Sequence, residues 1–394
     1  QLEIDLPNYH KVEWCLNKDD ISPQQIFDKH KYEGPKGRAE VAKYCVQDCE
    51  LCIHLLLLLD IVPNNLGMAN VSYVPASFIF LRGQGVKVTS VVARKCSERN
   101  TRIPDLKKIP RLNDYIKMYK NGKTKDEIFK QIIEDADWRK PEHYELEDWY
   151  NRSVIAAEKG IDGFEGAIVL DPKPGIYLDD PVAVLDYASL YPSSIIEKNI
   201  SHETHIEDHS LLPLIGKDNY HEVEYQNWIY INTGKGDTIE KKLGDGTTKC
   251  YFLKPEYMKE KGMVNDKEPL GIIPSVLNHL LSARTATKKA MKKEPDEFKK
   301  KVLDGLQLAY KVTANSVYGQ LGARTSTIFK MNLAACTTSI GRSRIDDASN
   351  GVAEWAQKKG YPLPDVIYGD TDSVFVKFSR IKDGKTLVGK EALQ

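Results

Sequence analysis

The chain has 394 residues, of which 41% are hydrophobic and 28% charged, with 26 glycines and 19 prolines. This composition excludes a collagen, a continuous coiled coil and a disordered chain, and it is typical of a globular enzyme of about two or three domains. Lys and Arg together number 56, as do Asp and Glu, so the net charge is zero. Any surface that binds an anion such as nucleic acid must therefore be local.

Cysteine content and apolar runs set the expected environment. Seven cysteines without a regular spacing favour a reducing, intracellular compartment, and we expect no disulfides. The longest apolar run, 51–59, is about half as long as a membrane helix and is interrupted by His54, so we expect no membrane partner. The chain begins without Met and without a signal-peptide pattern, and we expect it to be an internal piece of a longer protein.

The first predicted element is a helix over residues 37–62, where apolar residues recur at three- and four-residue steps and Pro63 follows. We expect this helix to lie in the core. Residues 100–160 are polar and weakly patterned, which predicts surface helices and an interdomain connector. Strands are predicted over 167–170 and 182–186, and the second should be buried and end at Asp186.

Residues 215–270 are expected to form an irregular excursion with short aromatic strands and glycine-rich turns. A helical hairpin is predicted over 273–319, with its break at 294–296. Two β-rich runs follow, 366–368 and 373–378, on either side of a polar turn at 369–372. These elements predict a mixed α/β (α+β) fold.

Three carboxylates stand at the ends of predicted strands. Asp186 ends one strand, and Asp370 and Asp372 lie in the turn of the last hairpin, so the three meet if the strands share a sheet. Two Mg²⁺ ions would offset their repulsion and could hold the attacking and leaving oxygens of a phosphoryl transfer. The alternative is that acidic turn residues only solvate a hairpin.

Cations and amides line one face of each helix of the predicted hairpin. Arg284 and Lys288 are four residues apart on the first helix, and Lys311, Asn315 and Tyr318 share a face of the second. Between 282 and 311, nine basic residues stand against four acidic ones, a local charge of +5. This pattern suits a metal-bound polyphosphate, although a charged run can also be a solvated helix face.

The same residues belong to three longer strings that resemble motifs of the family B DNA polymerases. Residues 186–193 resemble the first palm motif, 311–319 the fingers motif and 368–373 the second palm motif, and weaker agreement occurs at 82–85, 164–167 and 337–342. Within this family, the strings most resemble those of delta-like polymerases of large nucleocytoplasmic DNA viruses. The resemblance implies template-directed addition of deoxynucleoside triphosphates to a primer 3′-hydroxyl in DNA replication, by two-metal-ion nucleotidyl transfer.

The resemblance also implies roles for individual residues. Asp186, Asp370 and Asp372 would be catalytic, and Asp186, the Tyr187 carbonyl and Asp372 would hold the two Mg²⁺ ions. The residues that would bind the deoxynucleoside triphosphate are Ser189, Leu190, Tyr191, Arg284, Lys288, Lys311 and Asn315. Tyr191 would lie under the sugar and exclude ribonucleotides, and Tyr318 and Gly319 would contact the nascent base pair.

The implied architecture is the polymerase right hand, with an antiparallel-sheet palm, helical-hairpin fingers and the remnant of an RNase H-like 3′–5′ exonuclease. The expected boundaries are 1–65 for the end of the exonuclease domain, 66–163 for a connector and palm-proximal region, 164–271 for the first part of the palm with an insertion at 215–270, 272–322 for the fingers and 323–394 for the second, truncated part of the palm. Tyr44 and Asp48 would belong to the exonuclease remnant, and without the upstream motifs we expect no proofreading. The expected partners are primer–template DNA, the nucleotides and, through missing regions, a sliding clamp, in the host nucleus or a cytoplasmic virus factory.

Two other interpretations remain open at this point. Cys45, Cys49 and Cys52 have the spacing of an iron–sulfur cluster, but they fall in the predicted apolar helix, where we expect them to pack as small hydrophobic residues. The resemblance also implies a thumb that wraps the duplex, which we expect this chain to lack. The chain could then be a catalytically incompetent fragment that only binds nucleotide or DNA, because duplex affinity depends on phosphate contacts.

Overall fold

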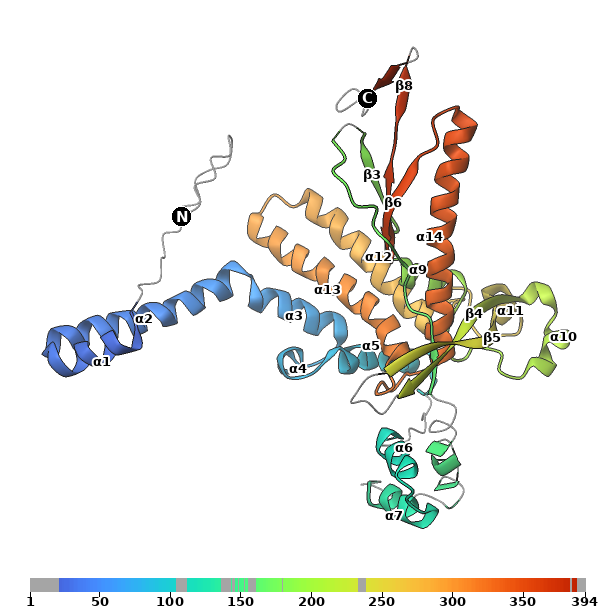
Figure 1. The fold of residues 1–394 in the computed structure, drawn as a ribbon, viewed down its shortest axis with the longest axis horizontal. Coiled ribbons are helices and arrows are strands. Elements are labelled where there is room, and N and C mark those ends of the chain that lie inside the picture. Colours follow the sequence, from blue (N-terminus) through green and yellow to red (C-terminus); the bar gives the residue numbers. More distant parts are fainter. Residues whose placement is uncertain are drawn as a thin grey trace.

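A computed structural model of the chain describes residues 21–103, 112–135, 161–178, 180–232, 239–382 and 385–387, with a few positions between 143 and 154. The first 20 residues of the predicted segment 1–65 lie outside this description. Helices and antiparallel sheets are mixed along the chain, as the sequence predicts (Figure 1).

A four-stranded antiparallel sheet carries the predicted carboxylates. Its strands, in spatial order, are β2 (Val169–Leu170), β6 (Asp365–Asp370), β7 (Ser373–Lys377) and β3 (Val182–Asp186). The long helix α14 (Met331–Lys359) covers one face, where Ile345 packs against Val374 and Val376. The predicted strand that ends at Asp186 is confirmed, but its predicted burial is wrong. Val184 is 54% exposed, because β3 is an edge strand and Val184 pairs with Phe375 on the face away from α14.

A second antiparallel sheet occupies most of the segment expected to be irregular. Strands β4 (Tyr220–Asn232) and β5 (Ile239–Leu253) form a long hairpin, and β1 (Ile161–Phe164) pairs with β4. The expectation of short strands was therefore wrong. Val223, Tyr225 and Phe252 are buried in the main core. The polar residues that alternate with them weaken the apolar signal of a strand with one solvated face.

The predicted helical hairpin is confirmed as α12 (Ile272–Lys293) and α13 (Glu297–Gly322). The Asp296 carboxylate accepts a hydrogen bond from the Lys299 amide at 3.0 Å and caps the start of α13. Helices α3 (Ile61–Ser72) and α5 (Gln84–Glu98) pack against α13, and α9 (Leu190–Glu197) packs against α12. Their apolar faces build the main core together with α14.

The predicted helix 37–62 is divided, and it does not lie in the core. Helix α2 (Gly34–Leu58) follows α1 (Pro23–Tyr32) and ends before Asp60, whose φ is 48°, and Pro63 lies in the first turn of α3. Gly37 is the one buried residue of α2. Residues 55–59, all leucine, are exposed, because α1 and most of α2 extend away from the other helices (Figure 1). Periodicity shows that a helix has an apolar face, but not which element covers it.

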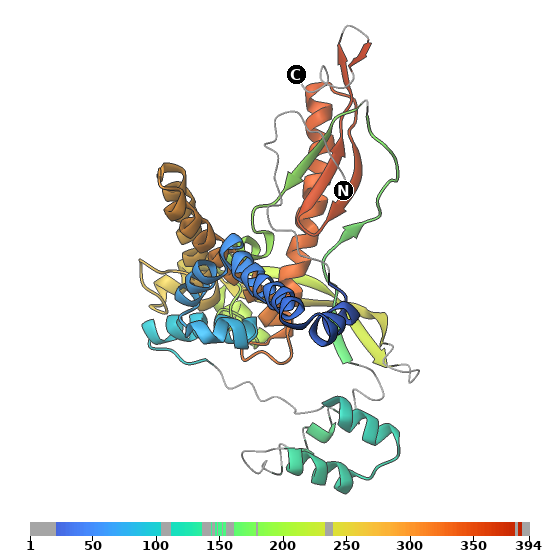
Figure 2. The same ribbon diagram turned by 90° about the vertical axis from the view of Figure 1, so that its left-hand side faces the viewer.

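Helices α6 (Leu112–Lys120) and α7 (Lys125–Asp135) stand apart from the sheets in both views (Figures 1 and 2). They share a small core of their own, in which Tyr115, Ile128 and Ile132 are fully buried. The other elements are α4 (Ala76–Leu81), two 3₁₀ turns (His209–Leu211 and Lys217–Asn219), α10 (Leu212–Ile215), α11 (Pro255–Glu260), β8 (Arg380–Lys382) and β9 (Lys385–Leu387). None of the helices in the described ranges is both long and apolar enough to cross a bilayer.

Candidate active site

A cavity of about 520 Å³ opens where the sheet, α9 and the α12–α13 hairpin meet. Its lining residues come from three distant parts of the sequence: Asp186, Tyr187, Ala188, Ser189, Leu190, Tyr191, Pro192, Arg284, Lys288, Lys311, Asn315, Tyr318, Thr371 and Asp372. The structure thus brings most of the predicted site residues together. Asp370, Gly319, Tyr44 and Asp48 do not line this cavity.

Strand pairing places two carboxylates at one edge of the sheet. In the β3–β7 ladder Asp186 stands opposite Ser373, and the Tyr187 amide donates a hydrogen bond to the Asp372 carbonyl at 2.8 Å. Thr371 has a φ of 54°, so the β6–β7 turn is tight and brings Asp372 next to the end of β3. Asp370 is exposed at the end of β6, where its carboxylate accepts a hydrogen bond from the Thr371 hydroxyl.

The electrostatics of this edge favour a cation. Burial, and then the negative charges of Asp186 and Asp370, raise the pKa of Asp372, while Lys311 acts in the opposite direction. Within the described residues, no group of three or more His, Cys, Asp or Glu side chains is placed to hold a metal ion. The candidate donors here are two carboxylates and a backbone carbonyl, which are oxygen ligands of the kind that Mg²⁺ prefers, usually with waters and substrate oxygens completing its shell.

The opposite wall of the cavity is cationic. Arg284 and Lys288 reach it from α12 and Lys311 from α13. Arg284 also donates a hydrogen bond from Nε to the Gln307 side chain at 3.3 Å, which links the two helices. No acidic side chain of the described residues lies close enough to these three cations to form an ion pair. Their charge is therefore available to an anion in the cavity.

Two tyrosine rings form the apolar wall. The centroids of Tyr191 and Tyr318 lie 4.4 Å apart, with the ring planes tilted by 37°. Burial raises the pKa of both phenols, that of Tyr318 to about 12, so both remain protonated at neutral pH. Ser189, with a φ of 57°, makes the sharp turn from β3 into α9 that brings Tyr191 to the cavity.

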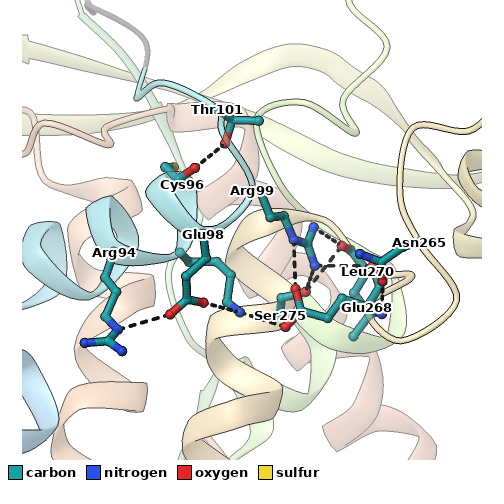
Figure 3. A network of polar contacts seen from close by, with 10 residues as sticks. Arg94, Cys96, Glu98, Arg99, Thr101, Asn265, Glu268, Leu270 and Ser275 are labelled. Atoms are coloured by element: carbon teal, nitrogen blue, oxygen red, sulfur yellow. Dashed lines mark hydrogen bonds and ion pairs between the residues drawn. The ribbon is translucent and has the colours of Figure 1, made fainter.

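The first turn of α12 is anchored by side chains that the sequence analysis did not identify (Figure 3). The Arg99 guanidinium donates hydrogen bonds to the Leu270 carbonyl and the Ser275 hydroxyl, both at 2.6 Å, and pairs with the Glu268 carboxylate at 3.1 Å. Arg99 follows the C-terminus of α5, far from α12 in sequence, and no local motif indicates the contact.

A second set of contacts caps α12 from the segment after α9. The Asn199 amide oxygen accepts from the Gly271 amide at 2.8 Å, the Ser201 hydroxyl accepts from the Ile273 amide at 3.2 Å, and the Glu203 carboxylate accepts from the Ile272 amide. Helix N-termini leave amides without partners, and these side chains satisfy three of them. The base of the helix that carries Arg284 and Lys288 is therefore fixed on two sides.

The predicted exonuclease residues and the cysteine cluster lie elsewhere. Tyr44 and Asp48 are half-buried on α2. Cys45, Cys49 and Cys52 are exposed on the same helix, so the expectation that they pack as small hydrophobic residues was wrong. They do not form a metal-binding group, which leaves the iron–sulfur interpretation without structural support. The six described cysteines are free thiols, and Cys15 lies outside the described residues.

Thr371, Ala188 and Pro192 also line the cavity, although no role was assigned to them. All three lie inside the strings quoted for the palm motifs, so the sequence signal that could have identified them was present. Gly341 and Arg342 of α14 lie close to Tyr191, and they belong to the weaker string 337–342.

Comparison with known proteins identifies the family of the chain. The profile of DNA polymerase family B matches residues 74–392. The chain is 37% identical to a DNA polymerase of Pyramimonas orientalis virus, over 97% of this chain and 29% of that protein. It is 33% identical to the DNA polymerase delta catalytic subunit of Candida albicans, over 92% of this chain and 27% of that one.

A solved structure, the family B DNA polymerase from the archaeon Pyrobaculum calidifontis, superposes with a TM-score of 0.52 at 25% identity, over 91% of this chain and 34% of that chain. The chain thus spans between about a quarter and a third of the length of these proteins. The resemblance to viral and delta-type polymerases is confirmed. Because the family profile matches far more than half of its residues, the chain belongs to DNA polymerase family B.

Proposed function

We propose that this chain carries the nucleotidyl-transfer site of a replicative DNA polymerase, which adds deoxynucleoside triphosphates to a primer 3′-hydroxyl. The observation that supports this most directly is the cavity between the sheet and the helical hairpin. It combines the carboxylates of Asp186 and Asp372 with the cations of Arg284, Lys288 and Lys311. Carboxylates opposite cations suit a metal-bound triphosphate.

Asp186, Asp372 and the Tyr187 carbonyl would hold the divalent metal, which we propose to be two Mg²⁺ ions. The raised pKa of Asp372 supports this, because burial and then the charges of Asp186 and Asp370 disfavour its carboxylate, and a bound cation would offset both effects. When bound, such ions activate the attacking hydroxyl and stabilise the charge on the transferred phosphoryl group. We place Asp370, outside the cavity lining, near the primer end.

The side chains of α12 and α13 would bind and orient the triphosphate. Arg284, Lys288 and Lys311 present positive charge to the phosphates, and Asn315 adds an amide on the same face of α13. We assign the backbone amides near Ser189 and Leu190 to the phosphates as well.

The tyrosine wall would contact the nucleoside. In this proposal Tyr191 lies under the sugar, where a 2′-hydroxyl would clash with the ring, and Tyr318 contacts the nascent base pair, with Gly319 beside it. Both rings border the cavity and touch each other, which supports their assignment to one substrate. Excluding the wrong sugar by a clash is an efficient route to specificity.

The subdomain boundaries given above belong to the same proposal. The four-stranded sheet would be the palm and α12–α13 the fingers. The segment 1–65, with Tyr44 and Asp48, would be the remnant of an exonuclease. Primer–template DNA would be the macromolecular partner, with a sliding clamp as a further one, and viral DNA replication in the nucleus or a cytoplasmic factory would be the setting.

Single-nucleotide extension of a labelled primer–template at low salt, with Mg²⁺, tests the proposal. Template-directed extension is expected from the chain and should be lost in Asp372→Asn. Asp218→Asn, which changes an exposed carboxylate that does not line the cavity, is the matched control and should extend normally. No extension by the unmodified chain, with nucleotide binding retained, would instead favour the binding-only alternative.

A further inference from the structure

The backbone of α14 passes very close to the Tyr191 ring at Gly341. A Cβ atom placed on Gly341 would lie 2.8 Å from Cε1 of Tyr191 and 3.4 Å from Cδ2 of Leu190. Gly341 is buried in the middle of a 29-residue helix, where glycine is otherwise less favourable than alanine. The close approach of the Tyr191 ring explains why a residue without a side chain stands at this position of the helix.

The ring has little freedom to avoid an added methyl group. Tyr318 lies against it, with the ring centroids 4.4 Å apart. Next to Gly341, Arg342 is held by the Glu165 and Gly166 carbonyls at 2.8 and 2.7 Å and by the Glu165 carboxylate at 3.2 Å. The Tyr191 ring is therefore confined by α14 and by Tyr318.

The direction of the displacement follows from the positions of the two residues. Tyr191 lines the cavity, whereas Gly341 does not, so Gly341 contacts the ring from the side of α14. A methyl group added there would push the ring toward the cavity. The space left for a sugar would decrease.

We infer that Gly341 is a specificity-determining position, because its missing side chain sets how far the Tyr191 ring enters the nucleotide cavity. The inference rests on the proposed function, in which Tyr191 lies under the sugar of the nucleotide. Gly341→Ala should weaken deoxynucleotide binding about tenfold, if a cost at the lower end of that for overpacking a core is transferred to the cavity by the displaced ring, and it should weaken ribonucleotide binding more strongly. The preference for deoxyribose should rise.

To test the inference, the dissociation constants of dATP and ATP are measured by calorimetry, with Mg²⁺ and without primer, for the unmodified chain and for Gly341→Ala. Gly351→Ala is the matched control: it lies on the same helix, and a Cβ there meets nothing within 4 Å. Both substitutions replace a helical glycine by alanine, so helix propensity cancels in the comparison. Gly351→Ala should leave both constants unchanged.

The same substitution in a Tyr191→Ala background tests whether Gly341 acts through the Tyr191 ring. In a Tyr191→Ala chain the obstacle is gone, so adding Gly341→Ala should change neither constant. An effect of Gly341→Ala that persists in this background, or that equals the effect of Gly351→Ala, or that relaxes the sugar preference, would overturn the inference. If Gly341→Ala alone does not fold but the double variant does, the clash with Tyr191 is confirmed.

Failure of this inference is distinguishable from failure of the proposed function. If the unmodified chain neither binds dATP nor extends a primer, the nucleotide site itself is wrongly assigned. If it extends primers and prefers deoxyribose, while Gly341→Ala behaves as Gly351→Ala does, only the role of Gly341 is wrong.

Discussion

Replacing Arg99 by alanine should loosen the base of α12. The side chain is only 13% exposed and makes four hydrogen bonds, to Glu268 twice and to Leu270 and Ser275 once each. Two of the acceptors keep a partner after the change, because Lys95 still pairs with Glu268 at 2.8 Å and the Ser275 hydroxyl still reaches the Leu270 carbonyl at 3.3 Å. At about 1 kcal/mol for each of the stronger bonds, the free energy of unfolding should fall by about 2 to 3 kcal/mol.

The same substitution should also weaken nucleotide binding. Arg284 lies on α12 about 14 Å beyond Ser275 at the usual helical rise, so a small rotation of the first turn displaces its guanidinium. Urea unfolding monitored by circular dichroism gives the stability, and calorimetry with dATP gives the affinity. We expect the affinity to fall by about tenfold at most, because Arg99 does not line the cavity.

Arg94→Ala is the matched control for this prediction. Arg94 lies on α5, which ends just before Arg99, but it is 54% exposed. It pairs with Glu98 (Figure 3), and its guanidinium lies over the Tyr73 ring. Exposed contacts of this kind contribute about 1 kcal/mol or less. If Arg99→Ala cost no more stability than Arg94→Ala, the argument that Arg99 anchors α12 would be refuted.

Three further predictions concern charge and exposure. Because the folded-state pKa of Asp372 is raised, the stability of the metal-free chain should fall as the pH rises above the ordinary value of 3.8. Asp372→Asn should therefore stabilise the chain at pH 7, by about 1 kcal/mol or less, but not below pH 4. Urea unfolding with a chelator measures both stabilities, and equal gains at the two pH values would contradict the prediction. Lys311→Ala should weaken dATP binding about tenfold by calorimetry, whereas Lys299→Ala, on an exposed part of the same helix, should not. The three cysteines of α2 should react with a thiol reagent much faster than the three buried ones, as followed by mass spectrometry, and equal rates would show that α2 is covered.

The sequence was most informative where chemistry and secondary structure coincide. The strand that ends at Asp186, the last hairpin and the helical hairpin were all predicted with nearly the right limits. Each has a strong local signal: a compact apolar run, a turn rich in small polar residues, or a break at Glu294-Pro295-Asp296. The side chains of the cavity follow from these elements, because strand ends and helix faces fix where they point.

The failures have a common physical origin. Residues 55–59 are apolar enough for a core, and Val184 is apolar enough for a buried strand, yet both are exposed. Hydropathy reports what a residue prefers, whereas burial depends on which other element lies against it. The anchors of α12 were missed for the same reason, since Arg99 and Glu203 act on a helix that is distant in sequence.

The order in which the cavity residues occur along the chain has a consequence for how the protein folds. The pairing of Asp186 with Ser373 closes a loop of roughly 190 residues, and the cations lie between these two ends. Strand pairings between residues so far apart in sequence form slowly, because the chain loses the entropy of closing the loop before the contacts between the strands stabilise it. During synthesis on the ribosome the site therefore cannot assemble until β7 has emerged. Before that point the helical hairpin can already pack against α3, α5 and α9, which are made earlier than the hairpin itself.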